Sequence, residues 1–323
     1  MNVLLTRRIP SSVLARLNAA HDVEIYDGPS PISEKDLKGR IAGKHALICL
    51  LTERITADVI AASELRVIAN IAVGYDNIDL AAARERGVIV TNTPDVLTEA
   101  VAEFTWTLIL AAARRLTEGE RLLRRGAWRG WALDFMLGTE LRGKQLGIIG
   151  RGRIGRAVAA KAPAFGMTVA FAAGRLTSLR QGYGPSTGLK PASTETILSI
   201  DQLLVSSDVI SLHVPGGEAT RHMIDRKALA RMKRSAILVN TSRGSVVDEE
   251  ALGWALKERL IAAAALDVYE REPAVHRDLL DMENVILAPH LGSATRETRT
   301  AMAALAVDNV LAVLAGQPPK TPV

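Results

Sequence analysis

Short apolar runs alternate with amphipathic stretches over the first hundred residues of the chain. The stretches predicted as helices are 11–19, 34–39 and 80–86. The apolar runs predicted as strands are 2–6, 21–25, 46–51, 67–71 and 88–91. Strands that alternate with helices indicate a parallel sheet covered on both faces. The first lobe is therefore predicted to be a small, doubly wound α/β domain.

A long apolar segment, residues 98–116, is predicted as a buried helix, with a threonine at its start and two arginines at its end. A polar stretch with several glycines, 118–143, follows it. A second series of strands and helices then runs from Lys144 to about His290. The last segment, 293–314, is rich in alanine and predicts a helix that can return to brace the first lobe.

Composition narrows the classes of protein that the chain can belong to. Its 323 residues are 48% hydrophobic, which suits two domains. The formal charge of +5 comes without a dense basic block, so nucleic acid is not an expected partner. We find neither a leader peptide nor an apolar run of membrane-spanning length, and expect a cytoplasmic protein without membrane contact. Cys49 is the sole cysteine and lies in an apolar run, which excludes a disulfide framework and a cysteine-based zinc site. No metal is expected.

A phosphate-binding turn is predicted between a strand and a helix. The apolar strand 145–149 is followed by Gly150-Arg151-Gly152-Arg153-Ile154-Gly155 and then by a helical run, 156–165. The first glycine permits a tight turn, the second lets the backbone approach a pyrophosphate, and the third lets the helix pack on the strand. Pro163 predicts that the helix ends early or kinks.

The second strand of this series, 167–172, bears on the choice of cofactor. A carboxylate at its end would accept from the ribose 2′-hydroxyl of NADH, but the sequence reads Ala172-Ala173-Gly174-Arg175. A guanidinium close to a position without a carboxylate favours a 2′-phosphate. We therefore predict that NADPH is preferred and that NADH is the weaker cofactor. The alternative is that Arg175 is only a solvated loop residue.

The chain resembles the D-isomer-specific 2-hydroxyacid dehydrogenases, and among them the glyoxylate/hydroxypyruvate reductases. The likeness covers nearly the whole sequence, in five ordered segments. They are AVGYDNID at 72–79, GRGRIG at 150–155, VNTSRG at 239–244, ALDVYEREP at 265–273 and APHLGSA at 288–294.

This resemblance implies two Rossmann-like, doubly wound parallel-sheet domains with an active-site cleft between them, and a homodimer. The substrate-binding domain would comprise residues 1–98 and 291–323, and the NAD(P)-binding Rossmann domain residues 99–290. Two features depart from the family pattern. The stretch 176–196 is longer than usual, and Arg151 stands where an apolar residue is common, either adding charge at the phosphate turn or pointing to solvent.

Reduction of a 2-keto acid needs a hydride donor, a proton for the carbonyl oxygen and a group that holds the carboxylate. A permanently charged guanidinium suits the last task, and Arg243 is the candidate. A proton donor should titrate near neutral pH, which points to histidine. Among six histidines, His290 matches the family's catalytic residue. Glu272 matches its carboxylate partner and is preferred to Glu270, because a proline follows it.

The resemblance also implies the binding residues. Asp267 would hold the nicotinamide carboxamide, and the backbone amides of Val73 and Gly74 would bind the substrate carboxylate together with Arg243. The other expected cofactor contacts are Thr98, Gly150, Gly152, Arg153, Ile154, Gly155, Arg175 and Thr241.

The sequence thus predicts an NADPH-preferring reductase of small 2-keto acids such as glyoxylate and hydroxypyruvate, with D-2-hydroxy acids as products and His290 as general acid and base. A phosphoglycerate-type or other D-2-hydroxyacid dehydrogenase is one alternative. A corepressor-like protein that senses dinucleotides is another, since the same residues do not exclude it. The sequence does not rank the possible 2-keto acids.

Overall fold

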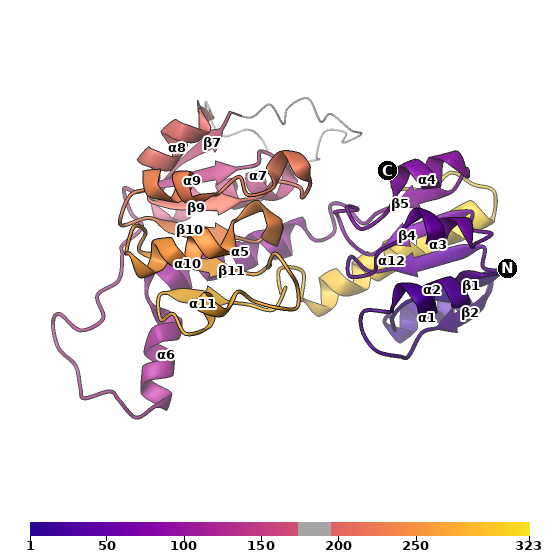
Figure 1. Ribbon diagram of the computed structural model, residues 1–323, viewed down its shortest axis with the longest axis horizontal. Coiled ribbons are helices and arrows are strands. Elements are labelled where there is room, and N and C mark those ends of the chain that lie inside the picture. The colour runs from indigo at the N-terminus through magenta and orange to yellow at the C-terminus, as the bar shows by residue number, and fades with distance from the viewer. Residues whose placement is uncertain (174–194) are drawn as a thin grey trace. The chain divides into compact units, whose positions relative to one another are not determined.

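The computed structural model describes residues 1–173 and 195–323 of the chain. They form two compact units, shown in Figure 1: one comprises Met1–Leu97 with Thr295–Val323, and the other is the continuous stretch Thr98–Ala294. The second unit is therefore an insertion within the first. The sequence predicted junctions at 98–99 and 290–291, whereas the second junction between the units falls four residues later.

A five-stranded parallel sheet forms the centre of the first unit, in the order β2-β1-β3-β4-β5. Its strands are β1 (Asn2–Leu5), β2 (Asp22–Ile25), β3 (Ala46–Cys49), β4 (Val67–Asn70) and β5 (Ile89–Thr91). The strand order reverses between β1 and β3, which is the doubly wound arrangement predicted for this lobe. β1, β3 and β4 are almost wholly buried, as expected for strands covered on both faces.

Helices cover both faces of this sheet, and the last of them comes from the far end of the chain. They are α1 (Ser11–Asn18), α2 (Glu34–Ile41), α3 (Ala57–Ala61), α4 (Leu80–Glu85) and α12 (Arg296–Leu314). Val307 and Val310 of α12 are buried in one cluster with Val3 and Leu5 of β1, so the final helix does return to the first lobe. The five-residue helix α3 was not predicted.

The second unit is built on a seven-stranded parallel sheet, in the order β12-β11-β10-β9-β6-β7-β8. Its strands are β6 (Gln145–Ile149), β7 (Thr168–Ala172), β8 (Thr196–Leu198), β9 (Val209–Leu212), β10 (Ile237–Asn240), β11 (Ala263–Leu266) and β12 (Val285–Leu287). The order reverses between β6 and β9. Ligands of such sheets bind at the carboxyl ends of the strands beside this reversal.

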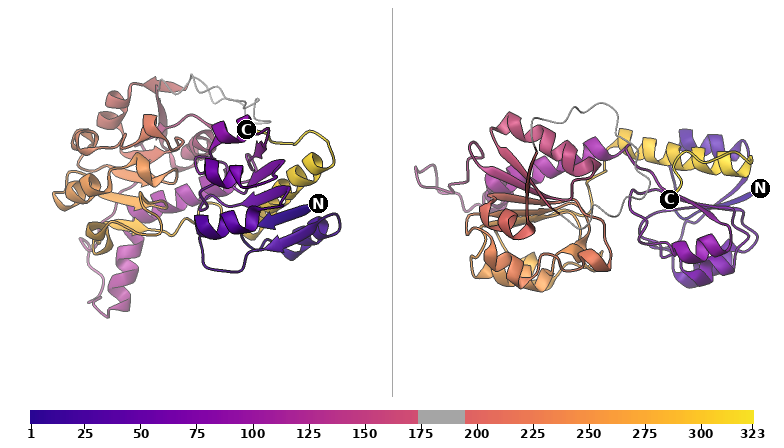
Figure 2. Two further views of the ribbon diagram at one scale, coloured as in Figure 1. Left: turned by 45° about the vertical axis from the view of Figure 1, so that its right-hand side comes forward. Right: turned by 90° about the horizontal axis from the view of Figure 1, so that it is seen from above.

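Two hydrophobic clusters fix the helices of the second unit to opposite faces of its sheet, as the right-hand view of Figure 2 shows. One face carries α5 (Thr98–Ala113) and α7 (Arg153–Lys161), and the other carries α8 (Ile200–Ser206), α9 (Arg226–Arg231) and α10 (Glu249–Lys257). The remaining helices are α6 (Leu116–Arg124) and α11 (Arg277–Leu280). Helix α7 stops at Lys161 and passes into a 3₁₀ turn, Ala162–Phe165, in agreement with the break predicted from Pro163.

One prediction for this unit was wrong. The helix expected over 98–116 ends at Ala113, because Arg115 takes a left-handed conformation (φ 51°) and starts a separate helix, α6. Helix α6 and the chain that follows it project from the sheet in Figure 1. We call residues 116–137 the arm.

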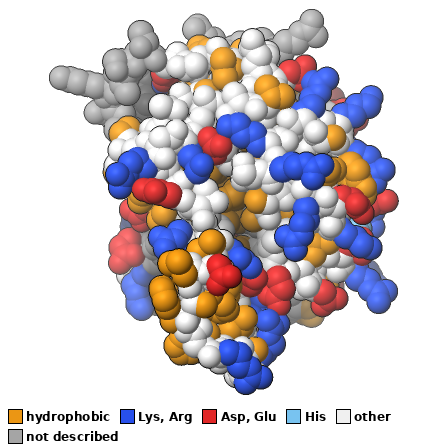
Figure 3. Space-filling model, turned by 90° about the vertical axis from the view of Figure 1, so that its left-hand side faces the viewer, with side chains coloured by type: hydrophobic (Ala, Val, Ile, Leu, Met, Phe, Trp, Pro, Cys, Tyr) orange, Lys and Arg blue, Asp and Glu red, His pale blue; other side chains and the backbone are white. Residues whose placement is uncertain are grey.

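The arm carries large apolar side chains on its surface. Trp131 and Leu133 are 82% and 83% exposed. The other exposed apolar residues of the arm are Leu116, Leu123, Trp128, Phe135 and Leu137. Hydrophobic side chains gather at the bottom of the view in Figure 3, where the arm lies. A patch of this kind is unusual for a solvent-exposed surface.

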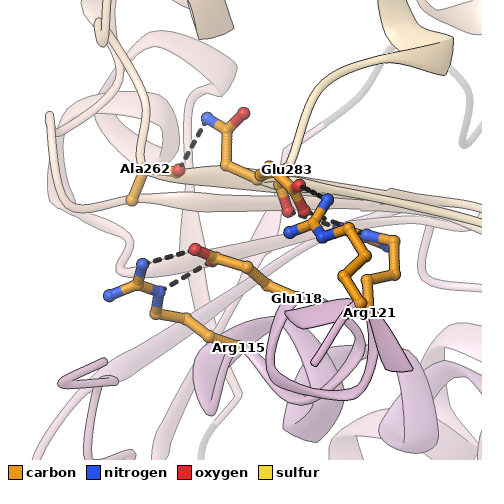
Figure 4. A network of polar contacts seen from close by, with 7 residues as sticks. Arg115, Glu118, Arg121, Ala262 and Glu283 are labelled. Atoms are coloured by element: carbon orange, nitrogen blue, oxygen red, sulfur yellow. Dashed lines mark hydrogen bonds and ion pairs between the residues drawn. The ribbon is translucent and has the colours of Figure 1, made fainter. Parts of the chain in front are cut away.

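The base of the arm is tied to the sheet by ion pairs, drawn in Figure 4. Glu283, just before β12, accepts from Arg121 at 3.0 Å and from Arg125 at 2.7 Å, and these hydrogen bonds lower the pKa of its carboxyl. Arg121 also donates to the backbone carbonyl of Glu283. Helix α6 is thus anchored by three contacts at one residue.

No helix in the described residues is both long and apolar enough to cross a membrane.

Candidate active site

The residues predicted to carry the chemistry lie on the second unit, in segments that follow neighbouring strands. Thr241 and Arg243 follow β10, Asp267 follows β11, and His290 follows β12. Parallel strands bring their carboxyl ends to one edge of a sheet. The glycine-rich turn follows β6 at the same edge, so the fold gathers the predicted cofactor turn and the predicted catalytic residues on one side.

The three glycines of the turn between β6 and α7 differ in what a side chain would meet at each position. Gly150 has φ 111°, and a Cβ there would lie 2.3 Å from the carbonyl oxygen of His213. A Cβ on Gly155 would lie 2.1 Å from the carbonyl oxygen of Gly150, so the helix packs directly on the turn. Gly152, the N-cap of α7, has open space beside it. The turn therefore leaves room for an anion at the N-terminus of α7, as a pyrophosphate requires.

The adenosine end of the predicted cofactor site is described only in part. Ala173 is exposed directly after β7, whereas Arg175 and most of the long stretch 176–196 lie outside the described residues. Arg151 does not simply point to solvent. Its guanidinium lies 3.2 Å from the carboxylate of Glu195, which also pairs with Arg156 of α7.

Glu272 and His290 form the hydrogen-bonded pair that the sequence predicted. Nδ1 of His290 lies 3.0 Å from Oε2 of Glu272, and the two side chains are 32% and 30% exposed. The other carboxylate oxygen of Glu272 accepts from the backbone N–H of Tyr269 at 3.0 Å. Burial would raise the pKa of the Glu272 carboxyl, but the hydrogen bond and charge of His290, with the charge of Arg243, lower it below its usual value. The carboxylate is thus held ionised against the imidazole.

The turn that carries His290 is fixed by the buried Asp267. The carboxylate of Asp267 accepts from the backbone N–H groups of Leu291 at 2.6 Å and Gly292 at 2.8 Å, and its backbone carbonyl accepts from the N–H of His290. His290 itself has φ 55°, a left-handed conformation. Burial raises the pKa of Asp267 despite these hydrogen bonds. Asp267 therefore orients the histidine as well as lying at the predicted nicotinamide site.

Arg243 lies half-buried beside this pair. Its guanidinium donates to the carbonyl of Ser242 at 2.8 Å, and its charge contributes to the lowered pKa of Glu272. Thr241, two residues earlier, shares a hydrogen bond of 3.0 Å with Thr105 of α5. The geometry thus supplies a cation, a carboxylate and an imidazole within one unit.

Another histidine near this edge has a structural role. His213 follows β9 and bonds Ser211 at 2.8 Å, and burial lowers its pKa to about 3. It therefore stays neutral at physiological pH, as expected for a core histidine.

The predicted carboxylate-binding residues belong to the first unit. Val73 and Gly74 lie in the loop after β4, and their backbone carbonyls accept from the side-chain amides of Asn92 at 2.7 Å and Asn70 at 2.8 Å. These asparagines are themselves buried. Because both carbonyls accept hydrogen bonds from buried side chains, the loop is held in one conformation.

Comparison with known proteins agrees with this geometry. Residues 106–292 match the model of the D-isomer-specific 2-hydroxyacid dehydrogenases, NAD-binding domain. The glyoxylate reductase of Korarchaeum cryptofilum is 46% identical over 321 residues, which cover 98% of this chain and 94% of that protein.

The chain belongs to the D-isomer-specific 2-hydroxyacid dehydrogenases. As a member, it is an NAD(P)-dependent oxidoreductase. The resemblance stated from the five sequence segments is thereby confirmed.

Solved structures extend the likeness to the whole fold. A protein of Thermus thermophilus has a TM-score of 0.91 and 43% identity, with 100% of both chains covered. An NADPH-dependent glyoxylate/hydroxypyruvate reductase from Sinorhizobium meliloti, solved with NADP and malonate, has a TM-score of 0.83 and 34% identity. That match covers 100% of this chain and 96% of the other.

No group of potential metal ligands occurs in the described part of this dehydrogenase.

Two residues of this dehydrogenase were missed by the sequence analysis. Glu249 is a buried carboxylate at the start of α10, and Tyr269 is a buried phenol on the loop that carries Glu272. The sequence offered only a weak signal for either. An acidic residue in the first turn of a helix is usually explained by the helix dipole, and an aromatic residue after a strand by packing.

Proposed function

We propose that the protein reduces glyoxylate to the achiral glycolate and hydroxypyruvate to its D-2-hydroxy acid, with NADPH as the preferred cofactor. The observation that carries the proposal is the pair of His290 and Glu272 at 3.0 Å, with the charge of Arg243 acting on the same carboxylate. Relatives named glyoxylate reductase, such as that of Korarchaeum cryptofilum, support the choice of substrate.

Each residue of the proposed site has a separate role in the reaction. The nicotinamide, when bound, supplies the hydride that adds to the carbonyl carbon. His290 donates a proton to the carbonyl oxygen from Nε2, since Nδ1 is engaged by Glu272. Glu272 stabilises the protonated imidazole, and the guanidinium of Arg243 polarises the carbonyl and pairs with the carboxylate. In oxidation the same imidazole accepts the proton.

The turn at the N-terminus of α7 would hold the pyrophosphate. The backbone of Gly152, Arg153 and Ile154 would approach it, and the close packing of Gly150 and Gly155 fixes the turn. Thr98, Thr241 and Asp267 are the further proposed contacts. For the substrate carboxylate we propose the backbone N–H groups of Val73 and Gly74, whose loop is fixed by two asparagines.

Oxidation of NADPH with a panel of 2-keto acids tests the substrate. The panel comprises glyoxylate, hydroxypyruvate, pyruvate and 3-phosphohydroxypyruvate. We expect kcat/KM to be highest for the first two, and chiral analysis of the product from hydroxypyruvate should give the D-isomer. A higher kcat/KM for 3-phosphohydroxypyruvate would instead assign a phosphoglycerate-type activity, and inactivity with every acid would refute the proposal.

The preference for NADPH rests on Ala173 and Arg175. Ala173 leaves the end of β7 without a carboxylate that would repel a 2′-phosphate. The double substitution Ala173→Asp with Arg175→Ala should reverse the ratio of kcat/KM for the two cofactors, because each charged contact contributes about tenfold to a hundredfold. Equal use of both cofactors by the unmodified enzyme would refute this assignment.

We also propose a homodimer that forms through the arm. Its exposed apolar side chains include two tryptophans, a residue type enriched at interfaces. A hollow of about 760 Å³ lies where the arm rejoins the sheet, lined by Leu110, Leu137 and Phe165 among others. Hydrogen bonds to Glu283 hold the helix of the arm in place. The second unit thus presents a large apolar surface, anchored at its base, to another copy of the chain.

A further inference from the structure

The loop between β11 and α11 carries Glu272, and its shape decides where that carboxylate lies. It begins after Leu266 and ends at His276, the N-cap of α11. One backbone hydrogen bond closes it internally, from the N–H of Ala274 to the carbonyl of Arg271 at 2.9 Å. Residues 271–274 are exposed. A short exposed turn of this kind needs outside contacts to hold a catalytic side chain in place.

Glu249 supplies two such contacts. Its side chain lies in the interior, with only 5% of the residue exposed, and one carboxylate oxygen accepts from the backbone N–H of Glu270 at 2.6 Å. The other oxygen accepts from the backbone N–H of His276 at 3.2 Å. A single carboxylate therefore joins two points of the loop, one on each side of Glu272. Both bonds have a charged acceptor, which makes them stronger than ordinary amide hydrogen bonds.

Glu270, the first residue that Glu249 holds, follows Tyr269, where the segments that carry the predicted catalytic residues meet. Gly244, next to Arg243, packs so closely that a Cβ there would lie 1.8 Å from the carbonyl carbon of Tyr269. The N–H of Tyr269 donates to Glu272, and its hydroxyl donates to the carbonyl of Ala288 at 2.9 Å, two residues before His290. Tyr269 thus contacts the segments of all three predicted catalytic residues, and Glu249 accepts from the N–H of the next residue, Glu270.

We propose that Glu249 is a positioning residue that holds Glu272 in register with His290 and Arg243. The role rests on the proposed function, because it presumes that Glu272 and His290 act as the proton-transfer pair. Glu249 acts through the backbone of the loop, at the N–H groups of Glu270 and His276. Neither the family comparison nor the sequence motifs single it out.

A simpler explanation is that Glu249 only stabilises α10. It stands in the first turn of that helix, where a negative charge interacts favourably with the helix dipole. The N-cap is already supplied by Asp248, which accepts from the N–H of Ala251 at 3.0 Å. A residue with this structural role alone would affect the melting temperature but not the ionisation of the catalytic pair.

Three variants distinguish the two explanations. Glu249→Gln keeps the size of the side chain, but its amide nitrogen cannot accept, so one loop N–H loses its acceptor. Glu249→Asp keeps the charge and is too short to reach both N–H groups. Glu250→Gln is the matched control, since Glu250 is the next residue of the same helical turn and is exposed. All three should be studied in the full-length protein, with melting temperatures to show that they fold.

The measurements are kcat and KM for glyoxylate with NADPH as a function of pH, and amide hydrogen exchange of the peptide 267–276. For both Glu249 variants we expect kcat to fall by about 10- to 100-fold, as for a catalytic group displaced by up to 1 Å. The pH profile of the reductive rate should differ from that of the wild type, and exchange in the loop should accelerate by about tenfold or more. Glu250→Gln should match the wild type in all three.

The possible outcomes separate the two proposals. If folded Glu249 variants keep the wild-type pH profile and loop exchange, Glu249 is not a positioning residue, whatever their melting temperatures. If the wild-type protein reduces no 2-keto acid, the proposed function fails. Loop exchange needs no activity and then decides alone whether Glu249 holds the segment that carries Glu272: unchanged exchange would overturn the positioning role as well.

Discussion

The substitution Gly244→Ala tests the contact between the Arg243 segment and the loop that carries Glu272. The new methyl group would meet three backbone atoms: the carbonyl carbon and oxygen of Tyr269, at 1.8 and 2.0 Å, and the nitrogen of Glu270, at 2.3 Å. Ordinary contact begins at about 3.4 Å, so the two backbones would have to separate by roughly 1.6 Å. No flexible side chain is available to yield.

The size of the effect follows from this displacement. Overpacking of a buried site costs about 1–3 kcal/mol of stability, so the variant should still fold. Misplacement by about 1 Å costs a catalytic group roughly 100-fold in rate. Because either Arg243 or the Tyr269–Glu270 peptide must move, we expect kcat/KM for glyoxylate to fall by at least 100-fold. The turn at Gly150–Gly155 is a different segment, so the affinity for NADPH should change little.

The assay compares kcat/KM, NADPH affinity by fluorescence, and the urea midpoint of the variant with those of Gly39→Ala. Gly39 lies in α2 of the first unit, and a Cβ there meets nothing within 4 Å. That control should keep full activity and gain up to about 1 kcal/mol, since alanine favours a helix over glycine. Activity of Gly244→Ala within threefold of the wild type would show that the close contact does not position the catalytic residues.

Three further predictions follow from the site and the arm. Arg243→Lys should lower kcat/KM for glyoxylate although it keeps the charge, because lysine cannot pair through a planar fork; near-normal kinetics would contradict the role of Arg243. The lowered pKa of Glu272 contributes stability that is present above its unfolded value of about 4.3 and is lost as the pH falls through the folded value. Glu272→Gln should therefore destabilise the protein at pH 7 and much less near pH 3, as measured by urea unfolding; a constant difference would refute this. Trp131→Ser with Leu133→Ser should weaken the proposed dimer in sedimentation equilibrium, whereas an unchanged dissociation constant would refute an interface at the arm.

The sequence predicted what repeats along the chain or follows from a short motif. Each apolar run of the first lobe became a strand of its sheet, and the glycine turn lies between β6 and α7 as predicted. These features depend on residues that are close together in the sequence, so the periodicity of apolar residues predicts them. The break at Arg115 could not be predicted in this way, because arginine and leucine at 115–116 suit a helix as well as a turn.

Long-range backbone contacts were also beyond the sequence. The bonds from Glu249 to the loop at Glu270 and His276 span 21 and 27 residues, and those from Asp267 to Leu291 and Gly292 span 24 and 25. Each joins a side chain to a backbone N–H, and every non-proline residue carries such a group. No residue type at the receiving end marks the contact, so it emerges only when the strands are arranged in three dimensions.

Because one unit is inserted within the other, the two units are completed at different times during synthesis of the chain. Val3 and Leu5 of β1 share their core with residues of α12 such as Val307 and Val310, nearly the whole chain away. Ribosomes add about 5–20 residues per second, so β1 waits roughly 15–60 seconds for the helix that covers it. The unit Thr98–Ala294 is continuous and can complete its sheet in the meantime. The second unit, with the proposed dinucleotide site, is then finished on the nascent chain before the N-terminal lobe, whose exposed apolar strands still need protection from aggregation.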